Sequence, residues 1–239
     1  MIIQLILVCS LFYSWLSQTA SAWTINRYLF SGRRITSLSS AAFDFSSPAE
    51  WDKFYQTEEE TNQEHVEWHS SIPLETIASY VTPDSKCLIP GCGNSRLPDV
   101  LLASVPGIRI SLQDSSTICM SQMEKKYGSS IEGYYCGDAT KLQDQFPSME
   151  EKFDTILDKG LSDALFCNEA WDYWISSLLR GACKILKEET GIYLLISYKL
   201  PKSTQEFLQE LGAEIGLEWT FDVLEYSNNR VGLSMAKKA

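Results

Sequence analysis

The chain has 239 residues, 44% of them hydrophobic, which is enough to bury the core of one domain. It carries 31 acidic and 20 basic residues, and the resulting net charge of −11 argues against a nucleic-acid partner. Such a charge is typical of a soluble enzyme or of a protein whose partner is basic. The cysteines are scattered and form no CxxC pair, so we expect free thiols, as in a reducing compartment, rather than a disulfide framework.

The first 45 residues differ in composition from the rest of the chain. Residues 1–22 resemble a signal peptide, because an apolar stretch from Ile2 to Leu16 precedes Ala20-Ser21-Ala22, a small-x-small cleavage pattern. Residues 23–45, rich in serine and threonine, resemble a transit peptide or a disordered segment. Together they resemble the bipartite presequence of algae with secondary plastids, although Trp23 stands where phenylalanine is usual. We therefore expect plastid localisation, with the secretory pathway as the alternative, and no membrane span after removal of the presequence.

Residues 46–239 are expected to form one domain that begins with a helix. Ser47 is the predicted N-cap of this helix, and the proline after it suits the first helical position. Trp51 and Tyr55 are spaced to share one face of the helix. The acidic and polar stretch from Thr57 to Glu64 is then expected to be a mobile loop.

Downstream, apolar runs of strand length alternate with segments of helical period. The expected strands are 86–89, 108–112, 133–136, 153–157, 191–198, 217–226 and 230–236. The expected helices are 72–80, 97–103, 116–127, 168–187 and 201–212. This alternation predicts an α/β fold with a mainly parallel sheet and helices on both faces. A turn at 227–229 would join the last two strands as an antiparallel hairpin.

The first predicted strand leads into a glycine-rich turn. Gly91 and Gly93 carry no Cβ, so the backbone can turn tightly there and approach a ligand closely. Asp114 follows the second strand, 21 residues after Gly93, where its carboxylate would reach ribose hydroxyls. An ordinary strand–helix loop would explain the two glycines equally well, but Asp114 favours a ribose-bearing ligand. Arg96 stands where the dinucleotide motif has its third glycine, so we expect adenosine without phosphates rather than NAD.

Two further aspartates follow strands in the same way. Asp138 comes after the third predicted strand and Asp158 after the fourth. Because the carboxyl ends of parallel strands meet at one edge of a sheet, both should lie near the glycine turn and Asp114. The sequence therefore predicts one polar site at this edge.

Three segments of the chain resemble one protein family. They are Trp51-Asp-Lys-Phe-Tyr55, Cys87-Leu-Ile-Pro-Gly-Cys-Gly-Asn-Ser95 and Phe153-Asp-Thr-Ile-Leu-Asp-Lys-Gly-Leu-Ser-Asp-Ala164. The family is the class I S-adenosylmethionine-dependent methyltransferases of the methyltransferase-like 13 type, which includes enzymes that methylate lysines of translation elongation factor 1A. The resemblance covers about residues 48–239. It implies a seven-stranded Rossmann-like methyltransferase sheet, S-adenosyl-L-methionine as cofactor, and a protein lysine as the methyl acceptor.

The resemblance also implies a cofactor site. It would consist of Trp51, Tyr55, Trp68, Gly91, Gly93, Asp114, Ser115, Asp138, Ala139 and Lys159. The glycine turn would lie against the methionine portion of the cofactor, the residues after the second strand would hold the ribose, and those after the third strand would flank the adenine. Lys159 would contact the cofactor near the target, and the three aromatic residues would close over it.

The chain departs from the family's pattern at Pro90, at Leu161-Ser162 and at His69. These departures leave the cofactor site intact and leave the acceptor open. A small-molecule methyltransferase, a non-catalytic methyltransferase-fold binding module and an NAD-dependent reductase are therefore alternatives to a lysine methyltransferase. No residue is assigned as catalytic.

Methyl transfer from a sulfonium requires mainly alignment and desolvation of the nucleophile. Trp51, Tyr55 and Trp68 can attract a sulfonium or an ammonium by cation–π contact, although core packing alone would also explain them. Asp158 and Asp163 would either orient an ammonium acceptor or cap the following helix.

The two histidines of the chain, His65 and His69, are spaced as in a helical metal site. They lack a third ligand nearby and are not in the His-Glu-x-x-His order. We therefore expect solvated or capping histidines and no metal site.

Overall fold

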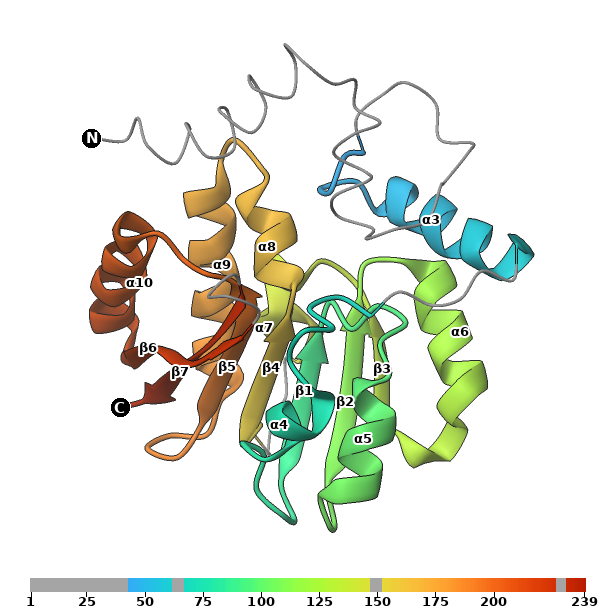
Figure 1. Ribbon diagram of the computed structural model, residues 1–239, viewed down its shortest axis with the longest axis horizontal. Coiled ribbons are helices and arrows are strands. Elements are labelled where there is room, and N and C mark those ends of the chain that lie inside the picture. Colours follow the sequence, from blue (N-terminus) through green and yellow to red (C-terminus); the bar gives the residue numbers. More distant parts are fainter. Residues whose placement is uncertain (1–42, 62–66, 147–151, 227–230) are drawn as a thin grey trace. The chain divides into compact units, whose positions relative to one another are not determined.

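The computed structural model describes residues 43–61, 67–146, 152–226 and 231–239 (Figure 1). The predicted signal and transit segments lie almost wholly outside these residues and stay predictions, and so does the turn at 227–229. Phe45–Ala239 forms one compact unit, and the description below concerns this unit alone. Within the described residues, no helix is long and apolar enough to cross a membrane.

The core of this unit is a seven-stranded sheet. Its strands are β1 (Lys86–Pro90), β2 (Arg109–Asp114), β3 (Gly133–Cys136), β4 (Thr155–Lys159), β5 (Ile192–Tyr198), β6 (Leu217–Tyr226) and β7 (Val231–Lys238). The order across the sheet is β3-β2-β1-β4-β5-β7-β6. The first five strands pair in parallel, and β7 runs antiparallel to both β5 and β6. The predicted mainly parallel sheet with a C-terminal antiparallel pair is confirmed.

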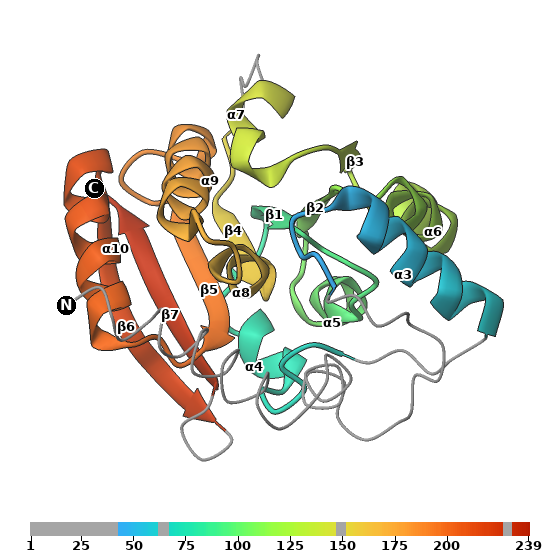
Figure 2. The same cartoon turned by 90° about the horizontal axis from the view of Figure 1, so that it is seen from above.

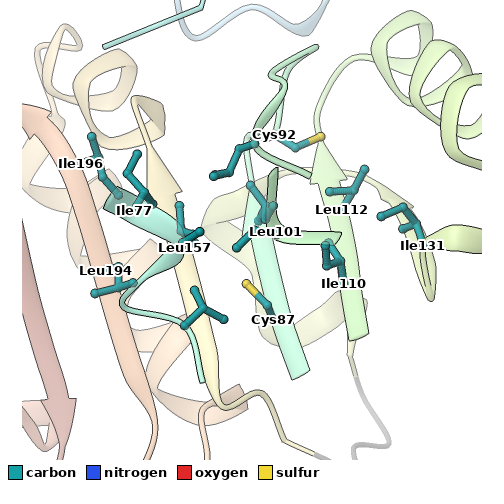
Figure 3. Close-up of a cluster of buried hydrophobic side chains, with 14 of the residues drawn as sticks. Ile77, Cys87, Cys92, Leu101, Ile110, Leu112, Ile131, Leu157, Leu194 and Ile196 are labelled. Atoms are coloured by element: carbon teal, nitrogen blue, oxygen red, sulfur yellow. The ribbon is translucent and has the colours of Figure 1, made fainter. Parts of the chain in front are cut away.

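Helices cover both faces of the sheet (Figure 2). They are α3 (Pro48–Thr61), α4 (Leu74–Ala78), α5 (Leu97–Ser104), α6 (Thr117–Tyr127), α7 (Leu142–Gln145), α8 (Leu161–Phe166), α9 (Trp171–Ile185) and α10 (Lys202–Ile215). Because successive strand residues point to opposite faces, Ile89 joins a core with α4, α5 and α6, whereas Leu88 joins a second core with α9 and α10. Figure 3 shows part of the first core, with Leu157 and Ile196 from neighbouring strands.

The strand order fixes where a ligand can bind. The chain proceeds outward from β1 to β2 and β3, then crosses back to place β4 on the other side of β1. At such a switch point the connections after two adjacent strands leave in opposite directions and open a crevice at the carboxyl ends. The loops after β1 and β4 leave the sheet at this edge, and α3 lies on the same side, beside α6 (Figures 1 and 2).

The prediction of a mobile loop from Thr57 is wrong for the residues that the structure describes. Helix α3 continues to Thr61. The Gln56 side chain donates a hydrogen bond to Glu60 one turn later, at 2.9 Å, and Asn94 from the glycine turn donates to Glu58 at 2.6 Å. Composition alone indicated a solvated loop. The helix forms because a side-chain pair within it and a contact from a distant turn both stabilise it. Residues 62–64 of the predicted loop lie outside the described residues.

Smaller differences concern the segment between β3 and β5. The short helices α7 and α8 were not predicted, because four to six residues give no readable period. Phe153 makes only an isolated bridge with Leu186, and β4 begins at Thr155. Helix α9 begins at Trp171 instead of Asn168, because the Asn168 side chain accepts a hydrogen bond from the Ala170 amide in a turn before the helix.

The last strand is tied to the end of α9 by a buried lysine. The Lys238 ammonium donates to the carbonyls of Cys183 and Leu186, at 2.6 and 3.3 Å, and to the Glu188 carboxylate at 2.8 Å. These carbonyls belong to the C-terminal turn of α9, where backbone acceptors lack helical partners and a cation is favoured. Lys238 therefore joins β7 to the helix that covers the second core.

Replacing Lys238 by methionine should lower the free energy of unfolding by about 2–4 kcal/mol, because buried carbonyls lose a charged donor. Lys237, the preceding residue of the same strand, is exposed and provides a matched control, since Lys237→Met should change stability by no more than about 0.5 kcal/mol. Urea denaturation followed by circular dichroism measures both. Equal effects of the two substitutions would show that Lys238 does not stabilise the contact between β7 and the end of α9.

Candidate cofactor site

The glycine turn after β1 is held in a conformation that favours glycine. Gly91 and Gly93 have φ values of +56° and +52°. A Cβ on Gly91 would lie 2.9 Å from the Leu161 Cβ, and a Cβ on Gly93 would lie 3.0 Å from the Tyr55 hydroxyl oxygen. Contacts inside the protein therefore leave little room for a Cβ at either position. The absence of a Cβ lets α8 and α3 pack close to the end of β1.

Asp114, at the carboxyl end of β2, anchors this turn. Its carboxylate accepts hydrogen bonds from the Gly93 amide at 3.0 Å and from the Ser116 amide at 2.9 Å. The side chain is buried, and burial raises the pKa of Asp114 although the backbone amides of Ser116 and Gly93 oppose that shift. A carboxylate has about four lone-pair positions, and the amides of Gly93, Ser115 and Ser116 leave only part of this capacity for ribose hydroxyls. The predicted proximity of the glycine turn and Asp114 is borne out, while the ribose contact stays a prediction.

Three aromatic residues cluster beside the turn. Trp51 stacks on Tyr55 with ring centroids 6.0 Å apart and meets Trp68 at 6.3 Å. Tyr55 is buried against Gly93, and the Trp68 ring lies 3.5 Å from the position of a Cβ on Gly160, in the turn after β4. The cluster thus reaches from the β1 turn to the β4 turn. Trp51 and Trp68 are only partly buried.

Asp52, between these aromatic residues in the sequence, was not predicted as a site residue. Its carboxylate accepts hydrogen bonds from the Ser116 hydroxyl at 2.5 Å and from the Ile118 amide at 3.2 Å. Burial opposes ionisation, but the hydrogen bonds from Ser116, Ile118 and Thr117 outweigh it and lower the pKa of Asp52. A carboxylate at the N-terminus of α6 is also favoured by the helix dipole. Asp52 therefore attaches α3 to α6.

Lys159, at the end of β4, forms a buried ion pair. Its ammonium lies 2.5 Å from the Glu67 carboxylate and donates to the Trp68 carbonyl at 3.0 Å. Glu67 also accepts from the Ser95 hydroxyl at 2.7 Å and from the Arg96 amide at 2.8 Å. Burial lowers the pKa of Lys159, and Glu67 opposes that shift. Glu67 thus links the turns after β1 and β4, a role that the sequence did not indicate because its partners are distant along the chain.

The residues predicted to flank the adenine follow β3. The Asp138 carboxylate accepts from the amide and the hydroxyl of Thr140, at 2.9 and 2.7 Å, and caps a short 3-10 helix. Ala139 is buried, and the Asp138 side chain is 47% exposed. Ser115, after β2, accepts a weak contact from the Cys136 thiol at 3.8 Å. These residues border the same sheet edge, and their contact with adenine stays a prediction.

The two aspartates considered for the acceptor serve structural roles. Asp158 is fully buried and accepts hydrogen bonds from the Ser162 amide at 3.1 Å and from the Tyr193 hydroxyl at 2.8 Å. Burial raises the pKa of Asp158 to about 6 although these hydrogen bonds lower it. Asp163 accepts from the Tyr198 amide at 3.2 Å. The alternative of capping fits Asp158, which bonds the first turn of α8.

The expectation of a solvated or capping His69 is wrong. The His69 side chain is 2% exposed, and its Nε2 lies 2.7 Å from the Asp163 carboxylate. Its ring also meets the Tyr198 ring edge-on, with centroids 5.0 Å apart. The spacing of two histidines could not show this, because Asp163 comes from a distant segment. His65 lies outside the described residues.

Proteins similar in sequence to this chain are lysine methyltransferases by name. The "eEF1A lysine and N-terminal methyltransferase" of Mus musculus is 32% identical over 130 residues, 53% of this chain and 18% of that protein. The Bos taurus protein of the same name is 30% identical over 176 residues, 70% of this chain and 24% of that protein. The "Citrate synthase-lysine N-methyltransferase CSKMT, mitochondrial" of Danio rerio is 24% identical over 71% of this chain and 76% of that protein. No family model matches the chain.

Solved structures with the same fold are also methyltransferases. A TehB-like S-adenosylmethionine-dependent methyltransferase from Corynebacterium glutamicum has a TM-score of 0.55 at 17% identity and covers 81% of this chain and 100% of its own. An S-adenosylmethionine-dependent methyltransferase from Clostridium acetobutylicum also has a TM-score of 0.55, at 14% identity, and covers 79% of this chain and 99% of its own. In sequence this chain is similar to lysine methyltransferases, and in fold it is similar to S-adenosylmethionine-dependent methyltransferases.

The predicted family resemblance and fold class are thereby confirmed. This chain spans about a fifth to a quarter of the length of the two mammalian proteins. The structure brings the ten predicted site residues to the carboxyl edge of β1 to β4 or onto the aromatic cluster beside it. It adds Glu67 and Asp52 as residues that hold the candidate site together.

Replacing Glu67 by glutamine should destabilise this domain by about 2–4 kcal/mol, because the buried Lys159 ammonium loses its counter-charge. Glu206, which pairs with Lys202 on the surface of α10, provides the matched control. Glu206→Gln should cost no more than about 0.5 kcal/mol. Urea denaturation compares the two variants, and a loss at Glu67 no larger than the control would show that the pair does not hold the site.

Proposed function

We propose that this chain is an S-adenosylmethionine-dependent methyltransferase that methylates lysine side chains of proteins. The observation that carries the proposal is the juxtaposition at one sheet edge of the Gly91–Gly93 turn, the buried Asp114 carboxylate and the aromatic cluster around Trp51. This edge is the ligand-binding side of a doubly wound sheet. The arrangement suits a ligand that has a ribose at one end and a cation at the other.

Different parts of the site would bind the ribose, the base and the sulfonium of the cofactor. The remaining hydrogen-bonding capacity of the Asp114 carboxylate can accept a ribose hydroxyl in a charge-assisted hydrogen bond. The turn after β3, with Asp138 and the buried Ala139, would border the base. The aromatic faces of Trp51 and Trp68 offer a partly buried surface to the sulfonium, which cation–π attraction favours.

The chain's contribution to methyl transfer would be alignment and exclusion of water. The cofactor supplies an activated methyl group, so the protein needs to hold an acceptor nitrogen in line with it and remove its hydration. The partly buried Trp51 and Trp68 can attract an incoming ammonium and cover the stem of a lysine side chain. The Glu67–Lys159 pair fixes Trp68 through its carbonyl and so fixes one wall of this region.

A protein lysine is favoured as acceptor by two observations. The similar sequences are named for lysine methyltransferases, including one that acts on a protein other than an elongation factor. The chain also has a net charge of −11, which attracts a basic segment of a partner. These observations support the lysine acceptor, and they do not identify the protein that carries it.

Isothermal titration calorimetry tests the cofactor. S-adenosylhomocysteine should bind to the wild-type chain, and Asp114→Ala should weaken binding by about 10- to 150-fold, because charge-assisted hydrogen bonds worth about 1.5–3 kcal/mol are lost. Asp172→Ala, on the exposed first turn of α9, is the control and should leave the affinity unchanged. Unchanged affinity in the Asp114 variant would refute the ribose placement. No binding to the wild type at near-millimolar concentration would favour the non-catalytic module instead.

Labelled methyl transfer into a cell lysate tests the acceptor. The wild-type chain with methyl-labelled S-adenosylmethionine should label protein, and mass spectrometry should place the label on lysine side chains. The Asp114→Ala variant is the matched blank, because it should label far less at the same cofactor concentration. Label on a small molecule, or on another side chain, would refute the lysine acceptor while leaving the methyltransferase activity in place.

A further inference from the structure

Two buried thiols and a carboxylate converge beneath the glycine turn. The Sγ atoms of Cys92 and Cys119 and a carboxylate oxygen of Asp114 all lie within 4.8 Å of one another. Cys92 belongs to the turn after β1, Asp114 ends β2, and Cys119 lies in the first turn of α6. All three side chains are buried, with exposed fractions of 4%, 6% and 0% respectively. Among the described residues, this is a group of three potential ligands assembled from separate elements.

The surroundings of this group are soft and polarisable. The Met120 sulfur lies 4.0 Å from the Cys92 sulfur. Burial raises the pKa of the Tyr55 hydroxyl, and the nearby Asp114 carboxylate adds to this shift. A hydrogen bond with Cys92, together with burial, raises the pKa of Cys119. A hydrogen bond from Cys119 lowers the pKa of Cys92, but burial and Asp114 outweigh it. The free cluster therefore holds neutral thiols at neutral pH.

We propose that Cys92, Cys119 and Asp114 form a binding site for a thiophilic d10 cation such as Zn²⁺ or Cd²⁺. Thiolates select such ions, and a carboxylate oxygen is a common third ligand. Met120 stands beside Cys92 as a soft fourth donor. As each metal–sulfur bond forms, the thiol releases its proton to solvent. The sequence spacing could not indicate this site, because three different elements supply its ligands.

The site would share Asp114 with the cofactor, a consequence that rests on the proposed function. Two positions of the carboxylate already accept the Gly93 and Ser116 amides, and a cation would draw on the same remaining lone pairs as the ribose. The cation would also bind Cys92, in the middle of the turn that faces the methionine portion. Cation and cofactor should therefore exclude each other, so a thiophilic ion would inhibit the enzyme.

The test is titration of the full chain with Cd²⁺, followed by the ultraviolet absorption of thiolate–cadmium bonds. Cys136 and Cys167 are exposed, and Cys9 lies outside the described residues, so all three are first replaced by serine to remove competing thiols. This background should bind one Cd²⁺ per chain with thiolate absorption. Cys119→Val in this background should weaken binding by more than about a hundredfold, since even changes outside the direct ligands cost 10- to 100-fold.

Cys87→Val is the matched control, because Cys87 is equally buried and lies further down β1 from Cys92 (Figure 3). It should leave Cd²⁺ binding unchanged, and thermal unfolding should show that both variants are folded. If Cys119→Val does not fold, Cys119→Ala replaces it with the same expectation. Absence of thiolate absorption in the background protein, or an equal loss in both variants, would overturn the cation site.

Calorimetry with S-adenosylhomocysteine separates this proposal from the proposed function. Cofactor binding should be present without Cd²⁺ and should weaken in proportion to the Cd²⁺ added. An affinity that does not depend on Cd²⁺ would overturn the shared use of Asp114. Cd²⁺ binding by a chain that binds no cofactor would support the cation site and refute the proposed function alone.

Discussion

The Asp114 carboxylate is the contact on which the candidate site depends. It ends β2, accepts the Gly93 amide from the turn after β1, and accepts the Ser116 amide at the start of α6. One buried charged acceptor thus satisfies two backbone donors from separate elements and fixes the turn, the strand and the helix relative to one another. These donors use only part of the hydrogen-bonding capacity of the carboxylate. Asp114 can therefore both hold the turn in place and bind a ligand.

The N-terminal segment completes the site through a second set of buried polar contacts. Asp52 attaches α3 to α6, and Glu67 joins the turns after β1 and β4 through Ser95 and Lys159. These contacts place Tyr55 against Gly93 and Trp68 against Gly160, so the aromatic residues are held beside the turns after β1 and β4. The polar contacts of Asp52 and Glu67 therefore determine where the aromatic rings of the N-terminal segment lie.

Strand positions could be predicted because each strand is a short apolar run between turn residues, and β1 to β5 follow this rule closely. The short helices α7 and α8 give no comparable signal, since one or two turns contain too few residues to show a period. The acidic end of α3 was misjudged for a different reason. Its composition indicates a solvated loop, but the contact of Glu58 with Asn94 stabilises the helix from outside the segment.

The sequence by itself determined the α/β class, the mainly parallel sheet, the glycine turn and Asp114, because periodicity and turn chemistry are local properties. Only the tertiary structure decided which side chains face each other across elements. The pairing of Lys159 with Glu67, the burial of His69 against Asp163, and the meeting of Cys92 with Cys119 belong to this group. Such contacts join residues far apart in the chain, and strand order and helix packing, which bring them together, leave no local pattern in the sequence.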